Sequence, residues 1–142
     1  MGRHAAASSA RERTNEWDVT PFELPSATGF EVLGRRLAPD GAPVALLACR
    51  PRTGRQHQIR AHLHHAGLHL VGDKIYGHDE MVFDRFTKGQ MTDDDRARMR
   101  LPRQALHAWR LSLPHPGTGE RLALECPLAP DLQAFWDACR AR

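Results

Sequence analysis

Alternation of apolar and polar positions predicts two β-hairpins in this chain. In the first, GFEVLGRRL (residues 29–37) and VALLACRP (residues 44–51) flank the turn sequence APDGAP. A Pro-Asp-Gly signal between two apolar runs is typical of a hairpin turn. In the second, residues 105–113 and 121–128 alternate on either side of HPGTGE. Because residues 44–49 include few polar side chains, we expect them to form a central strand covered on both faces.

A helix is predicted directly after the first hairpin. Thr53 and Gln56 fit the capping-box pattern at its start, and Gly67 supplies a stop at its end. The apolar positions between them recur at helical spacing and should face the core: Ile59, Leu63 and Ala66. Arg60 lies about 100° round the helix from Ile59, so we expect it at the border of the buried face.

Three further elements are predicted downstream. Residues 68–77, LHLVGDKIYG, should form a short strand with a Gly-Asp turn, and residues 92–99 a short helix capped by Thr92. Residues 130–142 should form a closing helix, capped by Asp131, with an apolar stripe made of Leu132, Phe135, Trp136 and Cys139. This order of elements indicates an α+β fold with a mixed, mainly antiparallel sheet and two packed helices.

The chain length of 142 residues allows one domain or part of a larger one. Residues 1–26 are rich in Ala, Ser and Arg and then contain Pro, so we expect a disordered or loosely attached arm, with the folded part in residues 27–142. No apolar run approaches the roughly 18 residues of a membrane helix. No apolar stretch of a secretory signal follows the basic start, so the sequence predicts a cytoplasmic protein.

Metal and thiol chemistry find little support in the sequence. Cys49, Cys126 and Cys139 are far apart among apolar neighbours, which indicates free, buried thiols. Five histidines occur in residues 53–77, but their spacing does not match a zinc motif, and we predict no metal site.

The charge pattern leaves two interpretations open. The net charge of +3 is a modest excess, and alone it indicates little about nucleic acid. Arg52, Arg55 and Arg60 lie close together with no acid between them, which suits either a solvated helix face or an RNA contact. The sequence TGRQHQ follows a strand and opens a helix, so it could hold a phosphate of RNA or another small anion.

Three segments together resemble one known family. RPRTGRQHQIRAHLHHAGLHLVGDKIYG (residues 50–77) is similar to the C-terminal signature of RluA-type pseudouridine synthases, which follows the pattern TGRxHQIRxHL, then LVGDxxYG. LPRQALHAWRLSLPHPGTGE (residues 101–120) resembles a further family segment, and LECPLAPDL (residues 124–132) resembles its closing strand and helix. The resemblance covers about residues 28–138, with the segments in the family's order.

The resemblance implies part of a pseudouridine synthase fold and an isomerase that converts uridine to pseudouridine in structured RNA. It implies neither cofactor nor metal, and a ribosomal or transfer RNA as partner. The base must be flipped out of its stack to be reached. In the family, an arginine of the QIR segment keeps a reactive aspartate ionised, and this arginine matches Arg60. The residues expected to contact RNA are Arg52, Arg55, Gln58 and Lys74.

The sequence departs from the family at the reactive aspartate. The family's RLDxxTSG-like segment has no match in the chain, and Asp40 of RRLAPDG is better explained as a hairpin-turn residue. We therefore predict that Arg60 has no carboxylate partner in this chain and that the chain alone is inactive. It would then be the C-terminal half of a synthase domain: a truncated product, a fragment or one piece of a split enzyme completed by a second polypeptide. A non-catalytic RNA-binding module is the alternative.

An incomplete domain should expose surface that is normally covered. We expect an unpaired strand edge and uncovered apolar side chains on residues 44–47, with loose folding or self-association as the consequence.

Overall fold

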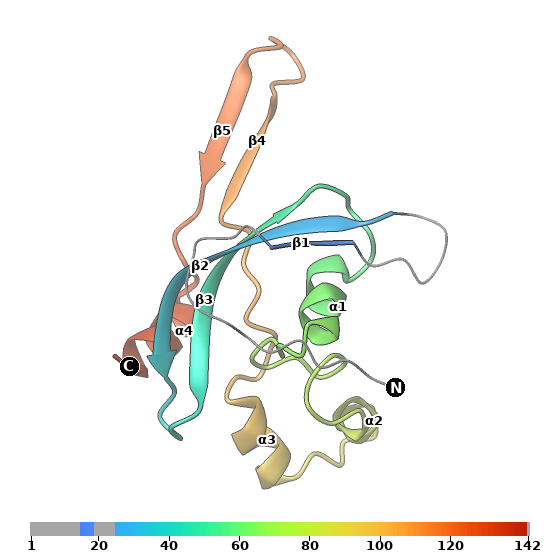
Figure 1. The fold of residues 1–142 in the computed structure, drawn as a ribbon, viewed down its shortest axis with the longest axis vertical. Helices are drawn as coiled ribbons and strands as arrows, with labels where there is room; N and C mark the ends of the chain where they lie inside the picture. The colour runs from blue at the N-terminus through green and yellow to red at the C-terminus, as the bar shows by residue number, and fades with distance from the viewer. Residues whose placement is uncertain (1–14, 19–24, 142) are drawn as a thin grey trace.

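The computed structural model describes residues 15–18 and 25–141, which form an α+β fold (Figure 1). The elements in chain order are β1 (Asn15–Asp18), β2 (Ala27–Leu37), β3 (Pro43–Pro51), α1 (Gln58–His65), α2 (Met81–Thr87), α3 (Asp93–Met99), β4 (Arg110–Pro114), β5 (Arg121–Glu125), α4 (Pro130–Ala138) and β6 (Arg140–Ala141). The strands make two antiparallel sheets, so the predicted fold class is confirmed. Strand β1 falls within the predicted N-terminal arm; most of that arm lies outside the described residues, and the prediction for it stays a prediction.

Strand β2 is the centre of the larger sheet. It pairs with β3 on one side, and on the other side with β1 near its start and β6 near its end. The hairpin of β2 and β3 is confirmed, with Gly41 at φ 85° in its turn. The prediction that residues 44–49 form a central strand is wrong for the described part of the chain, where only β2 pairs with β3. Strand order depends on partners distant in sequence, which local apolar content does not report.

Helix α1 begins at Gln58, later than predicted. The residue before it, His57, has a left-handed backbone at φ 54°, and no side chain caps the helix. The hydroxyl of Thr53 instead accepts from the first residue of β2 and donates to Gln58, so it ties the loop to the sheet. The capping box of Thr53 and Gln56 is therefore wrong, whereas the stop at Gly67, at φ 74°, is confirmed.

Residues 68–77 form turns, and the strand predicted there is absent. Gly72, at φ 73°, packs so closely against the Arg103 carbonyl that a Cβ at this position would come within 2.0 Å of its oxygen. Ala105 N donates to Val71 O at 2.7 Å. These contacts with residues 101–105 replace pairing within a sheet.

The two short helices that follow differ in how well the sequence marks them. Helix α3 is confirmed, with a reciprocal capping box between Thr92 and Asp95. Helix α2 has no counterpart among the elements that the sequence predicts.

None of the described helices has the length and apolar character needed to cross a membrane.

The second predicted hairpin is confirmed as β4 and β5, which extend away from the rest of the molecule (Figure 1). Residues Arg110–Glu125 are called the hairpin arm below. Helix α4 begins where predicted but ends at Ala138, and Arg140–Ala141 form strand β6 on β2 where the prediction continued the helix. Pro130 occupies the first turn of α4, and Ala129 is the N-cap. Asp131 forms an ion pair with Arg103 at 2.7 Å, so its assignment as the cap is wrong.

Among the described residues the core is small, and half of the buried residues are polar. Its apolar members are Ala38, Ala48, Leu63, Val82, Met99, Leu132 and Cys139. Its polar members are Ser26, Thr28, Gln58, Arg60, His62, Asp73 and Asp95.

Cys49 is half-buried, and burial raises the pKa of its thiol to about 11, but Cys126 is exposed, so the buried-thiol prediction fails there.

Apolar exposure is found away from the position expected. Residues 44–47 carry no strongly exposed large apolar side chain, although β3 has one edge that no described strand covers. The exposed large apolar residues are Val32, Leu33, Leu68, Ile75, Met81, Phe83, Phe86, Leu106, Trp109, Leu111 and Leu124. They lie on α2, on the hairpin arm and its approach, on the middle of β2, and, for Leu68 and Ile75, in the turns of residues 68–77.

Candidate active site

A buried ion pair joins helix α1 to the turns of residues 72–77. Arg60 Nε donates to Asp73 Oδ2 at 2.7 Å, and Arg60 Nη2 donates to Asp73 Oδ1 at 2.8 Å. The Arg60 side chain is 10% exposed and that of Asp73 is 0% exposed. The expectation that Arg60 has no carboxylate partner in this chain is wrong, whereas the absence of the family's reactive aspartate from the chain stays a prediction. The sequence pattern placed Asp73 only in a turn, but the turns fold back onto α1 and bring its carboxylate to Arg60.

The Asp73 carboxylate is held from two directions. Besides the two bonds from Arg60, its Oδ1 accepts from the backbone N–H groups of Ile75 at 2.9 Å and Tyr76 at 3.0 Å. Burial by itself would raise the pKa of Asp73, but the donors Arg60, Tyr76 and Ile75 outweigh burial and lower it. The hydrogen bonds from Arg60 to Asp73 likewise raise the pKa of Arg60. Both groups are therefore ionised at neutral pH.

Arg60 keeps one edge of its guanidinium unused. No described residue accepts a hydrogen bond from Nη1, and no fully buried side-chain nitrogen in the described part lacks a partner, so Nη1 reaches solvent. The Tyr76 ring lies under the group, with its centre 5.2 Å from Cζ. At this distance a cation is attracted to the face of the ring. The arginine thus has one edge on Asp73, one face on Tyr76 and a second edge open.

Gln58 links the loop before α1 to the sheet. Its Nε2 donates to Ala27 O and Thr28 Oγ1, both at 2.9 Å, and its Oε1 accepts from Thr53 and from Arg55 N. The residue is 6% exposed. The structure therefore does not support a direct RNA contact by Gln58, because its amide is used inside the protein to fix the shape of this loop.

His62 makes a second link between α1 and β2. Its Nδ1 lies 3.0 Å from the Thr28 hydroxyl and its Nε2 lies 3.0 Å from that of Ser26. Thr28 is fully buried. These contacts and those of Gln58 fix α1 against the start of β2, and so they fix the position of Arg60.

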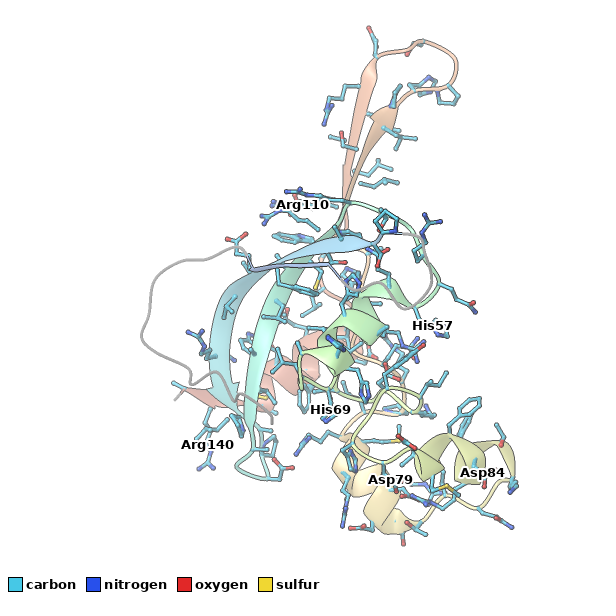
Figure 2. The ribbon with its side chains drawn as sticks, turned by 45° about the vertical axis from the view of Figure 1, so that its right-hand side comes forward. His57, His69, Asp79, Asp84, Arg110 and Arg140 are labelled. Carbon is cyan, nitrogen blue, oxygen red and sulfur yellow. The ribbon has the colours of Figure 1, made fainter. Side chains whose placement is uncertain are left out.

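Two of the predicted RNA-contacting residues lie at the surface of this loop. Arg52 and Arg55 are exposed at the start of what we call the site segment, residues 52–77. His57, which is labelled in Figure 2, is the residue directly before α1, and its Nδ1 lies 3.4 Å from the Tyr76 hydroxyl. The structure therefore brings the two basic side chains to the N-terminal end of α1, the end that the Tyr76 hydroxyl approaches.

Lys74 is directed elsewhere. Its Nζ donates to the carbonyl of Pro102 and lies 4.7 Å from the centre of the Phe86 ring. An RNA contact by Lys74 would have to compete with both interactions.

Among the described residues, no three His, Cys, Asp or Glu side chains gather as metal ligands would.

The sequence did not identify Asp73, Tyr76 or His62 as members of the site. A signal for the first two was present, because both belong to the VGDxxYG segment on which part of the resemblance rests. The periodicity of α1 placed Arg60 at the edge of the buried face. It could not show which side chain would reach it from another element.

Comparisons with known proteins point to one family. Residues 4–65 match the family described as RNA pseudouridylate synthase. The chain is 43% identical over 116 residues to ribosomal large subunit pseudouridine synthase D of Nitrosomonas europaea. It is 41% identical over 109 residues to ribosomal large subunit pseudouridine synthase C of Escherichia coli. These matches cover 82% and 77% of this chain.

A comparison with solved structures points to the same family. Human RNA pseudouridylate synthase domain containing 1 matches with a TM-score of 0.59 and 29% identity, over 84% of this chain and 41% of that chain. The chain spans about 30% of the length of the two curated relatives.

Proposed function

The chain belongs to the RluA-type RNA pseudouridylate synthase family over the part that these comparisons cover, and from this premise we propose that it takes part in converting uridine to pseudouridine in RNA. Both relatives are named as ribosomal large subunit pseudouridine synthases, which favours ribosomal RNA as the substrate class. The observation that carries the proposal is Arg60. The arginine that the resemblance marks as the partner of a reactive carboxylate is buried, fixed, and open along one edge.

The proposed role of Arg60 is electrostatic. In the reaction the base leaves its bond to the sugar through nitrogen, turns, and rejoins the sugar through carbon 5. An aspartate carboxylate that acts on the nucleotide must stay ionised in a closed pocket, and a nearby guanidinium favours the ionised form. The Nη1 edge of Arg60 can donate to such a carboxylate without releasing Asp73.

The chain's own candidate carboxylates are poor choices for the reactive group. Asp73 is fully buried and already accepts four hydrogen bonds, two of them from Arg60. Asp40 accepts from Ala42 N within the β2–β3 turn and pairs with Arg100 at 2.7 Å. We propose that the reactive aspartate comes from a segment outside these 142 residues, in one longer polypeptide or in a second one.

RNA would approach over the exposed start of the site segment. Arg52 and Arg55 supply positive charge there, and neutralised phosphates release counterions, which makes such binding sensitive to salt. The same surface supports the alternative function, an RNA-binding module that performs no chemistry.

Activity and binding assays separate the two functions. The purified chain is incubated with unmodified ribosomal and transfer RNA, alone and with a second polypeptide carrying an RLDxxTSG-like segment, and pseudouridine is quantified. We expect none with the chain alone, formation with both polypeptides, and loss of that activity with Arg60→Ala. RNA binding without pseudouridine in any combination would favour the binding module, and turnover by the chain alone would refute the need for an outside carboxylate.

A further inference from the structure

The contacts of Arg60 divide its guanidinium into an occupied edge and an open edge. The occupied edge, Nε and Nη2, faces Asp73, whose Oδ1 is also fixed by the N–H groups of Ile75 and Tyr76. The open edge carries Nη1, which reaches solvent. Because the backbone of the turn fixes the carboxylate, the direction of the open edge is set by residues 73–76.

We propose that Asp73 is a positioning residue: it holds Arg60 by one edge so that the Nη1 edge is presented, in a fixed direction, to a second carboxylate. Tyr76 completes the arrangement by covering one face of the guanidinium. This inference rests on the proposed function, since the second carboxylate is the reactive one of that reaction.

A purely structural role for this ion pair explains the arrangement less well. Replacing a buried ion pair by well-packed apolar residues is often neutral or stabilising, so a buried pair is weak evidence for stability alone. Here four donors converge on Asp73, whereas the opposite edge of Arg60 is left without a protein acceptor among the described residues.

The pairing with Asp73 also limits how strongly the positive charge of Arg60 stabilises a second carboxylate. Asp73 already compensates its positive charge, so a second carboxylate would meet donors in a fixed geometry more than an excess of charge. Such a carboxylate would be ionised and oriented, yet less stabilised than beside an unpaired guanidinium, which leaves it more reactive toward a nucleotide.

The test uses the full chain, nitrogen-15 NMR of its arginine side chains, and sodium formate as the probe carboxylate. In the wild-type protein we expect separately resolved Nη1 and Nη2 signals for Arg60, and a saturable shift at Nη1 with little change at Nε–H. Arg103 is the internal control, because it makes the same two-bond contact with Asp131 at the surface. Its signals should shift less, and without saturation.

Two variants sharpen the result. Asp73→Asn should abolish the preference for one edge, so that formate shifts the Nε–H signal as well as Nη1. Tyr76→Leu keeps the backbone N–H and should preserve the preference but allow Nη1 and Nη2 to exchange faster. If Asp73→Asn does not fold, the wild-type and Tyr76→Leu spectra still decide.

The proposal is overturned if formate shifts Arg60 no more than Arg103, or if it shifts Nε–H and Nη1 alike in the wild-type protein. The readout needs neither RNA nor turnover. A failure here therefore leaves the proposed reaction open, and an absence of pseudouridine leaves this test unaffected.

Discussion

The site segment and the hairpin arm distribute polarity in opposite ways. In the site segment, a carboxylate, a guanidinium, an amide and an imidazole are buried and hydrogen-bonded to one another, to the backbone, or to the hydroxyls of Ser26 and Thr28. In the hairpin arm, Leu111 and Leu124 are 58% and 50% exposed, while an Arg110–Glu125 ion pair lies on the other face. The burial of a side chain in this molecule thus depends on what the fold brings against it, and only partly on its own polarity.

The strand register of the hairpin arm leads to the same conclusion. Leu111 pairs with Leu124 and Leu113 with Leu122, so alternation puts these apolar side chains on one face, as predicted. No described element covers Leu111 and Leu124, the pair nearer the base of the arm. The site segment, by contrast, encloses its charged and polar groups, although two of its apolar side chains, Leu68 and Ile75, are 55% and 38% exposed.

Replacing Asp73 with Asn should lower the free energy of unfolding by about 3–5 kcal/mol, because it leaves a buried guanidinium without its charge partner. Urea denaturation measures the change. Asp131→Asn is the matched control: it breaks a contact of the same geometry whose side chains are 42% and 44% exposed, and it should lower stability far less, because solvent screens an exposed pair. Equal, small changes would show that the site segment is no more tightly organised than the surface.

Replacing Gly72 with Ala should destabilise the chain by roughly 2–4 kcal/mol. The alanine would have to keep the left-handed backbone of this position, and its Cβ would collide with the Arg103 carbonyl oxygen. Gly41→Ala is the control, since Gly41 has φ 85° but no atom within 4 Å of the added Cβ; it should cost about 1 kcal/mol. Thermal melting of both variants makes the comparison. A Gly72 variant as stable as the Gly41 variant would contradict the close packing of residues 72 and 103.

Replacing Arg52 and Arg55 with Ala should weaken RNA binding and reduce the slope of log affinity against log salt by about two units, roughly one for each arginine that no longer neutralises a phosphate. The control pair, Arg121→Ala with Arg140→Ala, removes the same charge from the hairpin arm and from strand β6 beside the end of β2, where Figure 2 labels Arg140. Binding is measured by fluorescence anisotropy at several salt concentrations. An equal change of slope in both pairs would place the RNA contact elsewhere.

Acid should destabilise the chain in part through Asp73. Its lowered pKa means that its contribution to stability is complete above its unfolded pKa of about 3.9 and is lost as pH falls through the lower folded value. The melting temperature of Asp73→Asn should therefore depend less steeply on pH below about pH 4 than that of the wild type. Parallel curves would mean that the carboxylate gains no protection from folding.

Replacing Leu111 and Leu124 with Thr should have the smallest effect on stability, within about 0.5 kcal/mol, because both side chains are exposed. It should reduce self-association, since an exposed apolar β surface favours contact between copies. Sedimentation velocity measures this. The control is Ser112→Thr with Ala123→Thr, which changes the paired residues of the opposite face and should leave self-association unchanged.

The sequence by itself determined much of the local structure. Turn chemistry marked both hairpins, Gly67 marked the end of α1, and Thr92 marked the start of α3, because each depends on residues that are neighbours in the chain. The motifs around Arg60 were also sufficient to indicate the family, because a family signature is a property of the residues and their spacing along the chain.

Only the tertiary structure decided what the site contains. The sequence predicts Thr53 as the cap of α1, but Thr53 bonds β2 and Gln58; it predicts Gln58 at the RNA surface, but Gln58 is buried. Asp73 is placed in a turn by the sequence and pairs with Arg60 in the fold. Each of these side chains has several satisfactory hydrogen-bond partners in principle. Which partner it meets depends on how elements distant in sequence pack together, and neither periodicity nor local propensity carries that information.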